Sequence, residues 1–285
     1  MKKSFFCIIA IGVLLAGCVS IPDRHSTVGK YNESGDINTK CRILPLNGPA
    51  APQQVDELNS RSFRVLNWNS HKGSNKKWQK DFERLTSHSD LVILQEGYLT
   101  NDLQELLNKK QYNWDIARAF SYKDIYAGVL TGSRVKPDFL CSFRVPEPLS
   151  GIPKTVLITR YPFSGTGETL LVANSHMINF SLDISAYNAQ LEKIAEAVSQ
   201  HRGPLIIAGD FNTWNKERLG ALADFTKQLG ARAVTFTKDH RATFMGHRFD
   251  HIFYRQLVPL EAFTEKVTTS DHNPMLVTFR LADDE

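Results

Sequence analysis

The residues of this sequence that could do chemistry are acids, amides and histidines at the ends of apolar runs. Those that end such a run are Asn69, Glu96, His176, Asp210 and Asn212. Asp271 and His272 come just before the last apolar run, and Asp250 lies inside another. Each residue alone is more typical of a turn, a helix cap or a packed side chain. A strand end is rigid and open to solvent, so together these residues predict one converging site.

Carboxylates and amides dominate this set, and they favour a particular kind of cation. Oxygen ligands suit a hard divalent ion such as Mg²⁺, whereas zinc would require cysteines or more histidines. The histidines are then expected to be acid–base or phosphate-contacting groups, with Asp250 orienting His272. Gly209 is expected to let the backbone before Asp210 approach a substrate closely.

The elements that must position these residues follow from the hydrophobic pattern. Apolar runs predict strands over 63–69, 90–96, 114–120, 126–131, 138–144, 154–161, 169–175, 204–209, 248–254 and 275–280. Helical spacing predicts helices over 78–85, 101–109, 187–198 and 215–229. Strands outnumber helices, and several strands follow one another with no helix between. The pattern therefore favours an α/β protein with two mixed sheets packed face to face and helices outside, and argues against a doubly wound parallel sheet.

The N-terminus has the pattern of a targeting segment. Lys2 and Lys3 precede an apolar run over 5–16 that is too short to span a bilayer comfortably. The run ends Leu15-Ala16-Gly17-Cys18, which resembles the lipobox of bacterial lipoproteins. That resemblance implies cleavage before Cys18, a lipid on Cys18 and a bacterial cell-envelope location, with the outer membrane favoured because Val19 follows the cysteine. A plain secretory signal or a short anchor helix is the alternative.

The rest of the chain divides by composition. We predict a signal peptide over 1–17, a tether over 18–61, a catalytic domain over 62–281 and an acidic tail over 282–285. Within the tether, residues 41–45 are apolar enough to dock on the domain. Cys41 and Cys141 could pair or could be independent buried thiols. With 42% hydrophobic residues, 4 cysteines and one long apolar run, the chain is not a disordered, disulfide-dense or polytopic membrane protein.

The positive charge is concentrated in one stretch. Residues 216–255 contain eight basic and four acidic residues, an excess equal to the formal +4 of the whole chain. If this stretch borders the site, it favours a polyanionic substrate. A solvated helix and loop face is equally consistent with it.

Six motifs in order resemble the endonuclease/exonuclease/phosphatase superfamily. They are Trp68-Asn69, Gln95-Glu96, Ser175-His176, Gly209-Asp210-Phe211-Asn212, Phe249-Asp250 and Ser270-Asp271-His272-Asn273-Pro274. The resemblance covers about 62–281. The superfamily includes deoxyribonucleases and sphingomyelinases. The sequence is more similar still to bacterial proteins of the YafD type, which have a counterpart of the motif at 176–181. It implies a four-layer α/β-sandwich and Mg²⁺- or Mn²⁺-dependent cleavage of a phosphoester by water.

The resemblance also implies a role for each residue. On the metal side, Glu96 is the principal ligand, Asp271 a further carboxylate, and Asn69 holds the ligand carboxylates in place. On the catalytic side, Asp210 deprotonates water, Asn212 bonds a phosphate oxygen, His272 stabilises the phosphorane-like charge or acts as an acid, and His176 contacts the phosphate or protonates the leaving group. We expect Asp210 and His272 to act from opposite sides of the scissile phosphorus.

The sequence departs from the nuclease pattern in three places. No acid stands in 126–133 to pair with His176, and Asp124 is the nearest. The chain shows no long insertion for reading DNA, and no aromatic hairpin of the kind with which secreted sphingomyelinases meet membranes.

Three functions follow, in order of preference. The first is a lipid-anchored, metal-dependent phosphodiesterase with endonuclease-like chemistry, for which nucleic acid is one substrate. The second is a phosphomonoesterase or a sphingomyelinase/phospholipase-C-like enzyme acting on lipid or sugar phosphates. The third is a non-catalytic binding lipoprotein. We expect a monomer whose partners are the phosphoester and, through its anchor, the membrane.

Overall fold

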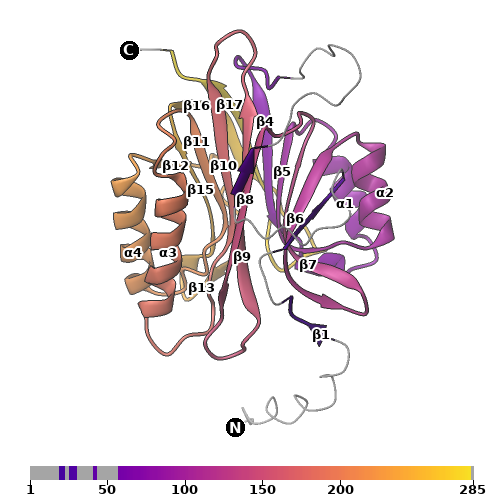
Figure 1. The fold of residues 1–285 in the computed structure, drawn as a ribbon, viewed down its shortest axis with the longest axis vertical. Helices are drawn as coiled ribbons and strands as arrows, with labels where there is room; N and C mark the ends of the chain where they lie inside the picture. Colours follow the sequence, from indigo (N-terminus) through magenta and orange to yellow (C-terminus); the bar gives the residue numbers. More distant parts are fainter. Residues whose placement is uncertain (1–18, 23–25, 31–40, 44–56, 284–285) are drawn as a thin grey trace.

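Two β-sheets packed face to face form the centre of the computed structural model, which describes residues 19–22, 26–30, 41–43 and 57–283 (Figure 1). The predicted signal peptide and Cys18 lie outside the described residues. The first sheet has the order β1-β6-β7-β5-β4-β17-β16, with β2 also pairing with β6. Its strands are β1 (Val19–Ser20), β2 (Thr27–Gly29), β4 (Phe63–Asn69), β5 (Leu91–Tyr98), β6 (Asn113–Tyr122), β7 (Ile125–Ser133), β16 (Leu257–Thr264) and β17 (Met275–Leu281).

The second sheet has the order β12-β15-β11-β10-β9-β8-β3. Its strands are β3 (Cys41–Ile43), β8 (Phe139–Pro146), β9 (Pro153–Pro162), β10 (Thr169–His176), β11 (Leu205–Asp210), β12 (Arg232–Ala233) and β15 (Asp250–Arg255). A separate hairpin joins β13 (Thr243–Phe244) and β14 (His247–Arg248). Both sheets are mixed, because β4–β5 and β10–β11 are parallel pairs whereas their other neighbours pair antiparallel.

Helices cover the outer face of each sheet. The helix α1 (Trp78–Leu85) and the helix α2 (Asn101–Lys109) pack on the first sheet, whereas α3 (Ser185–Val198) and α4 (Lys216–Gln228) pack on the second. A 3₁₀ turn, η1 (His71–Gly73), follows β4. The predicted four-layer α/β-sandwich is confirmed.

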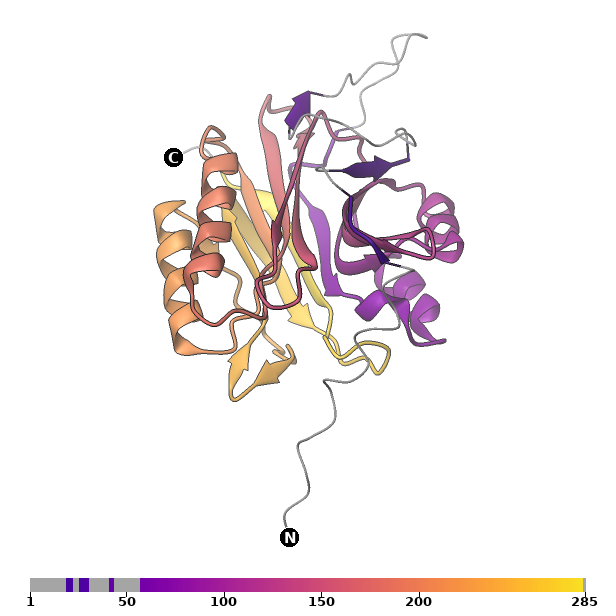
Figure 2. The ribbon, with the colours of Figure 1, turned by 60° about the horizontal axis from the view of Figure 1, so that its bottom comes forward.

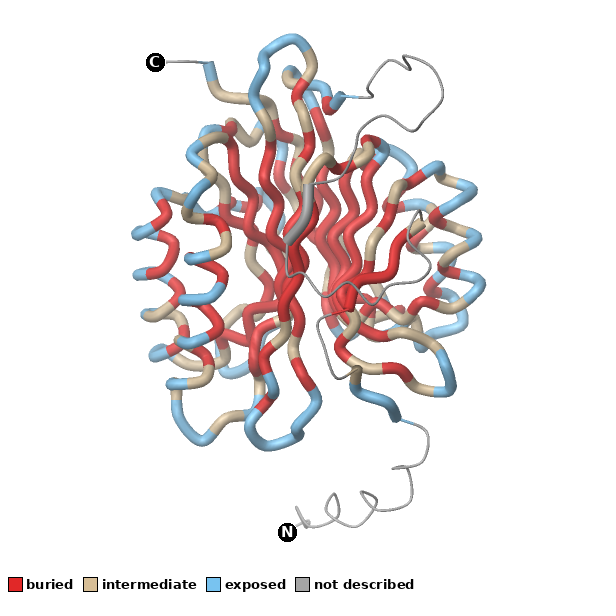
Figure 3. The backbone as a smooth tube through the Cα atoms, viewed as in Figure 1, coloured by how far each residue is buried: buried red, intermediate tan, exposed pale blue. Residues whose placement is uncertain are grey.

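Alternating side chains explain why the central strands are apolar on both faces. In β4, Val65 packs between the sheets while Leu66 packs toward the helices. Figure 3 shows the resulting buried backbone running through both sheets. Among the described residues, no helix combines the length and apolar character needed to cross a bilayer.

One strand longer than three residues was not predicted from the sequence. The strand β16 lies at the edge of the first sheet, carries Pro259 and Glu261, and has an irregular register between them. Proline cannot donate to a β-ladder and is tolerated mainly at edges and bulges. A strand built this way lacks the apolar run by which the others were recognised.

The predicted tether contains strands where the structure describes it. Within 18–61, β1 and β2 pair with β6, and β3 pairs with β8. The expected docking of the 41–45 segment is therefore confirmed for β3, while residues 44–45 lie outside the described residues. The β3–β8 register sets Cys41 opposite Cys141, and Cys141 is disulfide-bonded.

Candidate active site

Three predicted residues meet because of strand register in the second sheet. His176 at the end of β10 pairs with Asp210 at the end of β11, and Asp210 pairs with Asp250 at the start of β15. Asp210 lies on the same strand face as Ala208, which packs between the sheets. The three side chains therefore lie together at one end of the core between the two sheets.

The first sheet supplies the other half of the site. Asn69 Nδ2 donates to Asp210 Oδ2 at 3.0 Å, which joins the two sheets directly. Trp68 Nε1 donates to the carbonyl oxygen of His272 at 3.0 Å, and Ser270 Oγ donates to the carbonyl oxygen of Asn69 at 2.7 Å. The end of β4 thus clamps the turn that carries His272.

Both ends of the Asn69 amide are hydrogen-bonded, and its nitrogen holds a carboxylate. Its Oδ1 accepts from the backbone N–H of His71 at 3.2 Å while its Nδ2 holds Asp210. The structure therefore connects Asn69 directly to Asp210.

His272 is a cation held by Asp250. Its Nδ1 donates to Asp250 Oδ2 at 2.7 Å, and both residues are buried. Burial lowers the pKa of His272, but the carboxylates of Asp250, Asp210 and Asp271 outweigh it and raise that pKa to about 10. The ring is therefore an oriented imidazolium at neutral pH.

Asp210 has the properties of a general base. Burial and the nearby Asp250 carboxylate raise its pKa to about 6, against the opposing effect of His272. Its Oδ1 accepts from the backbone N–H of Asn212 at 3.0 Å. A carboxylate with such a pKa is ionised at neutral pH and basic enough to take a proton from water.

Two details of the sequence prediction need correction here. His272 Nε2 lies 3.9 Å from Asp210 Oδ2, which leaves no room for a phosphorus atom between them. The two groups therefore lie side by side. Gly209 serves the contact between β10 and β11, since a Cβ there would lie 1.8 Å from the carbonyl oxygen of Ser175.

The partner of His176 is a lysine, which the sequence did not reveal. Lys154 Nζ lies 3.0 Å from His176 Nε2, and Asp210 Oδ2 lies 3.6 Å from the same nitrogen. Burial and the Lys154 ammonium hold the pKa of His176 well below its usual value, so the ring is neutral and Nε2 accepts from Lys154. Asp124, the acid nearest in sequence, is an exposed turn residue.

Glu96 leaves the β-ladder at an irregularity between Leu94 and Gly97, with φ of 50°. A non-glycine residue at positive φ is uncommon and often marks a functional position. Burial raises the pKa of Glu96, but His176, Lys72 and Lys154 outweigh it and lower that pKa to about 2. The carboxylate is therefore permanently charged and contacts the Lys72 ammonium.

The second predicted metal-side carboxylate has a similar setting. Asp271 Oδ1 lies 2.8 Å from His71 Nδ1, so both carboxylates contact side chains of η1. Their oxygens suit a hard divalent cation, and the Lys72 ammonium beside Glu96 indicates a place that attracts cations. The donor set therefore fits Mg²⁺ or Mn²⁺.

Another group could also hold an ion by proximity alone. Ligand atoms of Asp210, Asp250 and His272 lie within 4.8 Å of one another. A metal there would have to break the Asp250–His272 hydrogen bond. Glu96 and Asp271, the metal ligands expected from the sequence, contact Lys72 and His71, and their role as ligands stays a prediction.

Asn212, two residues after Asp210, has a left-handed backbone conformation with φ of 48°. Its Nδ2 donates to the carbonyl oxygen of Met177 at 3.0 Å, which fixes the amide at the floor of the site. An amide nitrogen carries two hydrogens, so one remains for a phosphate oxygen.

A buried polar network beneath the site was also missed. Gln95 Nε2 donates to Asn67 Oδ1 at 3.0 Å within the first sheet, and to Asn174 Oδ1 of the second sheet at 2.9 Å. Asn174 Nδ2 in turn donates to the carbonyl oxygens of Leu94 and Leu130. The available signal was a polar residue inside an apolar strand.

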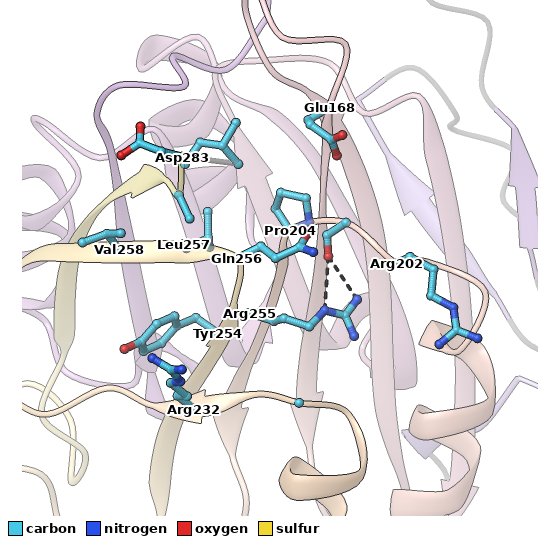
Figure 4. A pocket seen from close by; sticks show the side chains of 14 residues that line it. Glu168, Arg202, Pro204, Arg232, Tyr254, Arg255, Gln256, Leu257, Val258 and Asp283 are labelled. Atoms are coloured by element: carbon cyan, nitrogen blue, oxygen red, sulfur yellow. Dashed lines mark hydrogen bonds between the residues drawn. The ribbon is translucent and has the colours of Figure 1, made fainter. Parts of the chain in front are cut away.

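Three arginines of the basic stretch 216–255 have internal partners. Arg218 and Arg255 donate to backbone carbonyls, and Arg241 pairs with Asp239. Arg255 helps to line a pocket of about 810 Å³ at the opposite end of the second sheet, where its guanidinium bonds the Gly203 carbonyl (Figure 4). The excess of basic residues in 216–255 therefore gives little support to a surface that binds a polyanionic substrate at the site.

Comparison with known proteins agrees with this geometry. Residues 58–272 match the model of the Endonuclease/Exonuclease/phosphatase family. A UPF0294 protein of Photorhabdus laumondii is 39% identical over 220 residues, covering 77% of this chain and 84% of the relative. A UPF0294 protein of Vibrio campbellii is 32% identical over 279 residues, covering 98% and 96%. The human Nocturnin catalytic domain shares the fold, with a TM-score of 0.61, 16% identity, and coverage of 80% and 97%.

Proposed function

The chain belongs to the endonuclease/exonuclease/phosphatase family, whose members are generally phosphoester hydrolases, and from this we propose that it is a divalent-metal-dependent phosphodiesterase held in the bacterial cell envelope by a lipid on Cys18. The observation that carries the catalytic part is the pairing of a base and a cation. Asp210, with a pKa of about 6, lies 3.9 Å from His272, with a pKa of about 10. Hydrolysis of a phosphoester requires both a proton acceptor for water and positive charge at the phosphoryl oxygens.

Asp210 accepts the proton of the attacking water in this proposal. Asn69 holds its Oδ2 and the Asn212 N–H holds its Oδ1, so the carboxylate is fixed before substrate binds. The His272 imidazolium, oriented by Asp250, stabilises negative charge on the phosphoryl oxygens. Fixed donors of this kind stabilise a transition state without reorganising during the reaction.

Lys154 provides the second cation of the site. Because His176 is neutral and its Nε2 accepts from Lys154, the proton on this side of the site belongs to the lysine ammonium. His176 therefore positions Lys154 near the phosphate, in place of the acid role that the family resemblance gave it.

Glu96 and Asp271 would hold the divalent cation. Bound there, Mg²⁺ or Mn²⁺ would supply Lewis-acid neutralisation of phosphoryl charge. Both carboxylates have lowered pKa values, so they remain ionised and ready to bind a cation throughout the neutral range.

The test compares Asp210→Asn, His272→Ala and the double variant on bis-p-nitrophenyl phosphate in Mg²⁺. Each single change is expected to reduce the rate by on the order of 10²–10⁴-fold, the usual contribution of a positioned acid or base. The double variant should lose far less than the product of the two, since the groups act together. Asp224→Asn, at an exposed position of α4, is the matched control.

Thermal melts establish that each variant is folded. Near-wild-type turnover by either single variant would contradict the mechanism. A parallel panel of p-nitrophenyl phosphate, plasmid DNA and sphingomyelin separates monoesters, nucleic acid and phospholipid as substrate classes.

A further inference from the structure

Exposed apolar side chains gather at the active-site end of the molecule. Nine large hydrophobic residues are exposed in the part of the chain that the structure describes. Six of them form what we call the apolar rim: Leu149, Ile152, Phe180, Leu182, Phe244 and Met245. Leu182 is 91% exposed and Met245 is 83% exposed.

The first four rim residues lie on two loops that flank His176 and Lys154. Phe180 and Leu182 follow His176 on the loop after β10, and Leu149 and Ile152 precede β9, where Lys154 lies. The β8–β9 and β9–β10 pairings set both loops at the same end of the second sheet.

A buried carboxylate ties these two loops together. Glu147 is 4% exposed, and its Oε1 accepts from the backbone N–H groups of Asn179 at 2.7 Å and Phe180 at 3.0 Å. Its Oε2 accepts from Ser150 Oγ at 2.7 Å, on the other loop. The two loops are therefore one ordered unit.

A buried guanidinium holds the same unit from below. Arg218 donates to the carbonyl oxygens of Ile178 at 2.7 Å and Asn179 at 2.9 Å, and to Ser181 Oγ at 3.0 Å. Burying a carboxylate and a guanidinium is unfavourable unless each is fully hydrogen-bonded. The Glu147 carboxylate and the Arg218 guanidinium both fix a loop that presents Phe180 and Leu182 to solvent. A loop ordered in this way indicates a contact surface.

The remaining two rim residues lie on the β13–β14 hairpin. Its two-residue turn has positive φ at both Met245 and Gly246, the geometry that suits a tight hairpin. The hairpin leads directly into β15, where Asp250 lies, and Arg241 Nη1 donates to the carbonyl oxygen of Asp250 at 3.0 Å. Figure 2 shows it projecting as the small orange-gold hairpin at the lower left. Phe244 is exposed on this hairpin, which the sequence did not reveal.

The chain enters the domain at this same end. Val19, the residue after the predicted lipidation site, pairs with Tyr122 in β1–β6. The carbonyl oxygen of Tyr122 accepts from the hydroxyl of Tyr98, two residues beyond Glu96. Val19 and Ile21 are themselves exposed, whereas Leu260, the ninth exposed residue, lies on β16 toward the opposite end. Figure 1 shows β1 and β13 toward the same, lower end of the molecule.

We propose that the active-site end docks on a phospholipid bilayer through the apolar rim, and that the phosphoester it cleaves is a lipid whose head group lies at that surface. Phenylalanine, leucine and methionine on protruding loops insert readily into the boundary between head groups and acyl chains. The cleavage half of this inference rests on the proposed function, whereas the docking half does not.

Docking is tested with the full lipidated chain in vesicles of phosphatidylethanolamine and phosphatidylglycerol with brominated acyl chains. Bromine on the acyl chains quenches the fluorescence of a tryptophan only where its side chain reaches those chains. Leu182→Trp should be quenched several-fold more strongly than the control Leu260→Trp, after subtraction of the parent's own tryptophans. Equal quenching at both positions, or none at 182, would overturn docking by this end.

Cleavage is tested with Phe180→Ser combined with Leu182→Ser, against Leu260→Ser. Loss of two inserted side chains should reduce hydrolysis of vesicle phospholipid or sphingomyelin by about tenfold or more, with hydrolysis of bis-p-nitrophenyl phosphate unchanged. Hydrolysis of the soluble diester with no hydrolysis of any vesicle lipid overturns the lipid-substrate half. Quenching of Leu182→Trp without hydrolysis of any phosphodiester supports docking and refutes the proposed function.

Discussion

The buried groups of this site lie next to one another, but their surroundings give them different protonation states. Asp250 makes His272 a cation, burial and the same carboxylate raise the pKa of Asp210, and burial and Lys154 lower the pKa of His176 and keep it neutral. The register of β10, β11 and β15 sets His176, Asp210 and Asp250 side by side, so that these groups can act on one another. The division of labour between base and cation is therefore a consequence of position.

This division predicts a pH dependence. Asp210 must be ionised to act as a base, and its pKa is raised to about 6. The rate should therefore fall as the pH decreases through about 6, and should be about tenfold lower at pH 5 than at pH 7. His176 has a pKa well below its usual value and should add no second transition between pH 6 and pH 8.

The measurement is kcat for bis-p-nitrophenyl phosphate from pH 4.5 to 8 at saturating Mg²⁺. Asp224→Asn should reproduce the wild-type profile. A rate that stays level down to pH 4.5 would exclude Asp210 as the base.

Glu96 gives a second prediction at the scale of a single residue. Glu96→Gln removes a carboxylate charge beside the Lys72 ammonium, so the affinity for Mg²⁺ or Mn²⁺ should fall at least about tenfold. Titration calorimetry with Mn²⁺ measures the affinity directly, and the rate should fall with it. Glu83→Gln, which changes an exposed carboxylate paired with Lys109, is the matched control. Unchanged affinity in Glu96→Gln would remove this residue from the metal site.

The sequence identified the residues that end apolar strands, because strand ends can be recognised from hydrophobic runs. It did not identify Lys154, whose contact with His176 depends on the register between β9 and β10. Nor did it identify His71 and Lys72, which reach Asp271 and Glu96 because both adopt positive φ in η1. Contacts that depend on register or on a rare backbone conformation leave no local pattern to read.

At the scale of elements, the regular strands and helices were predictable and the edges were not. The helix α2 begins and ends where its apolar spacing predicted, capped by Thr100, whose side chain accepts from the Leu103 N–H. The short strands β1, β2, β12 and β13 have two or three residues each, too few for a periodic pattern. They form because neighbouring strands offer unpaired backbone groups.

The loop between β10 and α3 owes its shape to one side chain on another element. Arg218 lies on α4, is 2% exposed, and stacks 4.5 Å from the ring of Trp214 while its guanidinium bonds the loop. Lysine cannot reproduce this planar set of donors. Arg218→Lys should therefore destabilise the protein by about 2–4 kcal/mol, the range for breaking a buried charged network.

Chemical denaturation measures this loss, and Arg232→Lys, at an exposed arginine, should change stability by no more than about 0.5 kcal/mol. Arg218→Lys should also weaken vesicle docking, because the loop would no longer hold Phe180 and Leu182 outward. Wild-type stability in Arg218→Lys would show that the guanidinium network does not fix the loop.

At the scale of the whole molecule, the position of β1 bears on how an anchored enzyme would lie on its membrane. Because β1 begins at Val19 and pairs with β6, only one peptide bond separates Cys18 from the first sheet. A lipid on Cys18 would then hold the active-site end, and the apolar rim with it, against the bilayer. The opposite end, with Leu260 and the pocket around Arg255, would face away.

An enzyme held in this way should act on its own membrane and very little on others. With protein and substrate lipid in the same vesicles, hydrolysis should exceed that in separate vesicles by on the order of 100-fold, because tethering raises the effective substrate concentration. The soluble diester should be hydrolysed equally in both arrangements, which controls for the amount of active enzyme. Equal lipid hydrolysis in the two arrangements would mean that the anchor does not present the site to its own bilayer. In that case the apolar rim would have to reach membranes by diffusion, and the Cys18→Ser protein should be just as active on them.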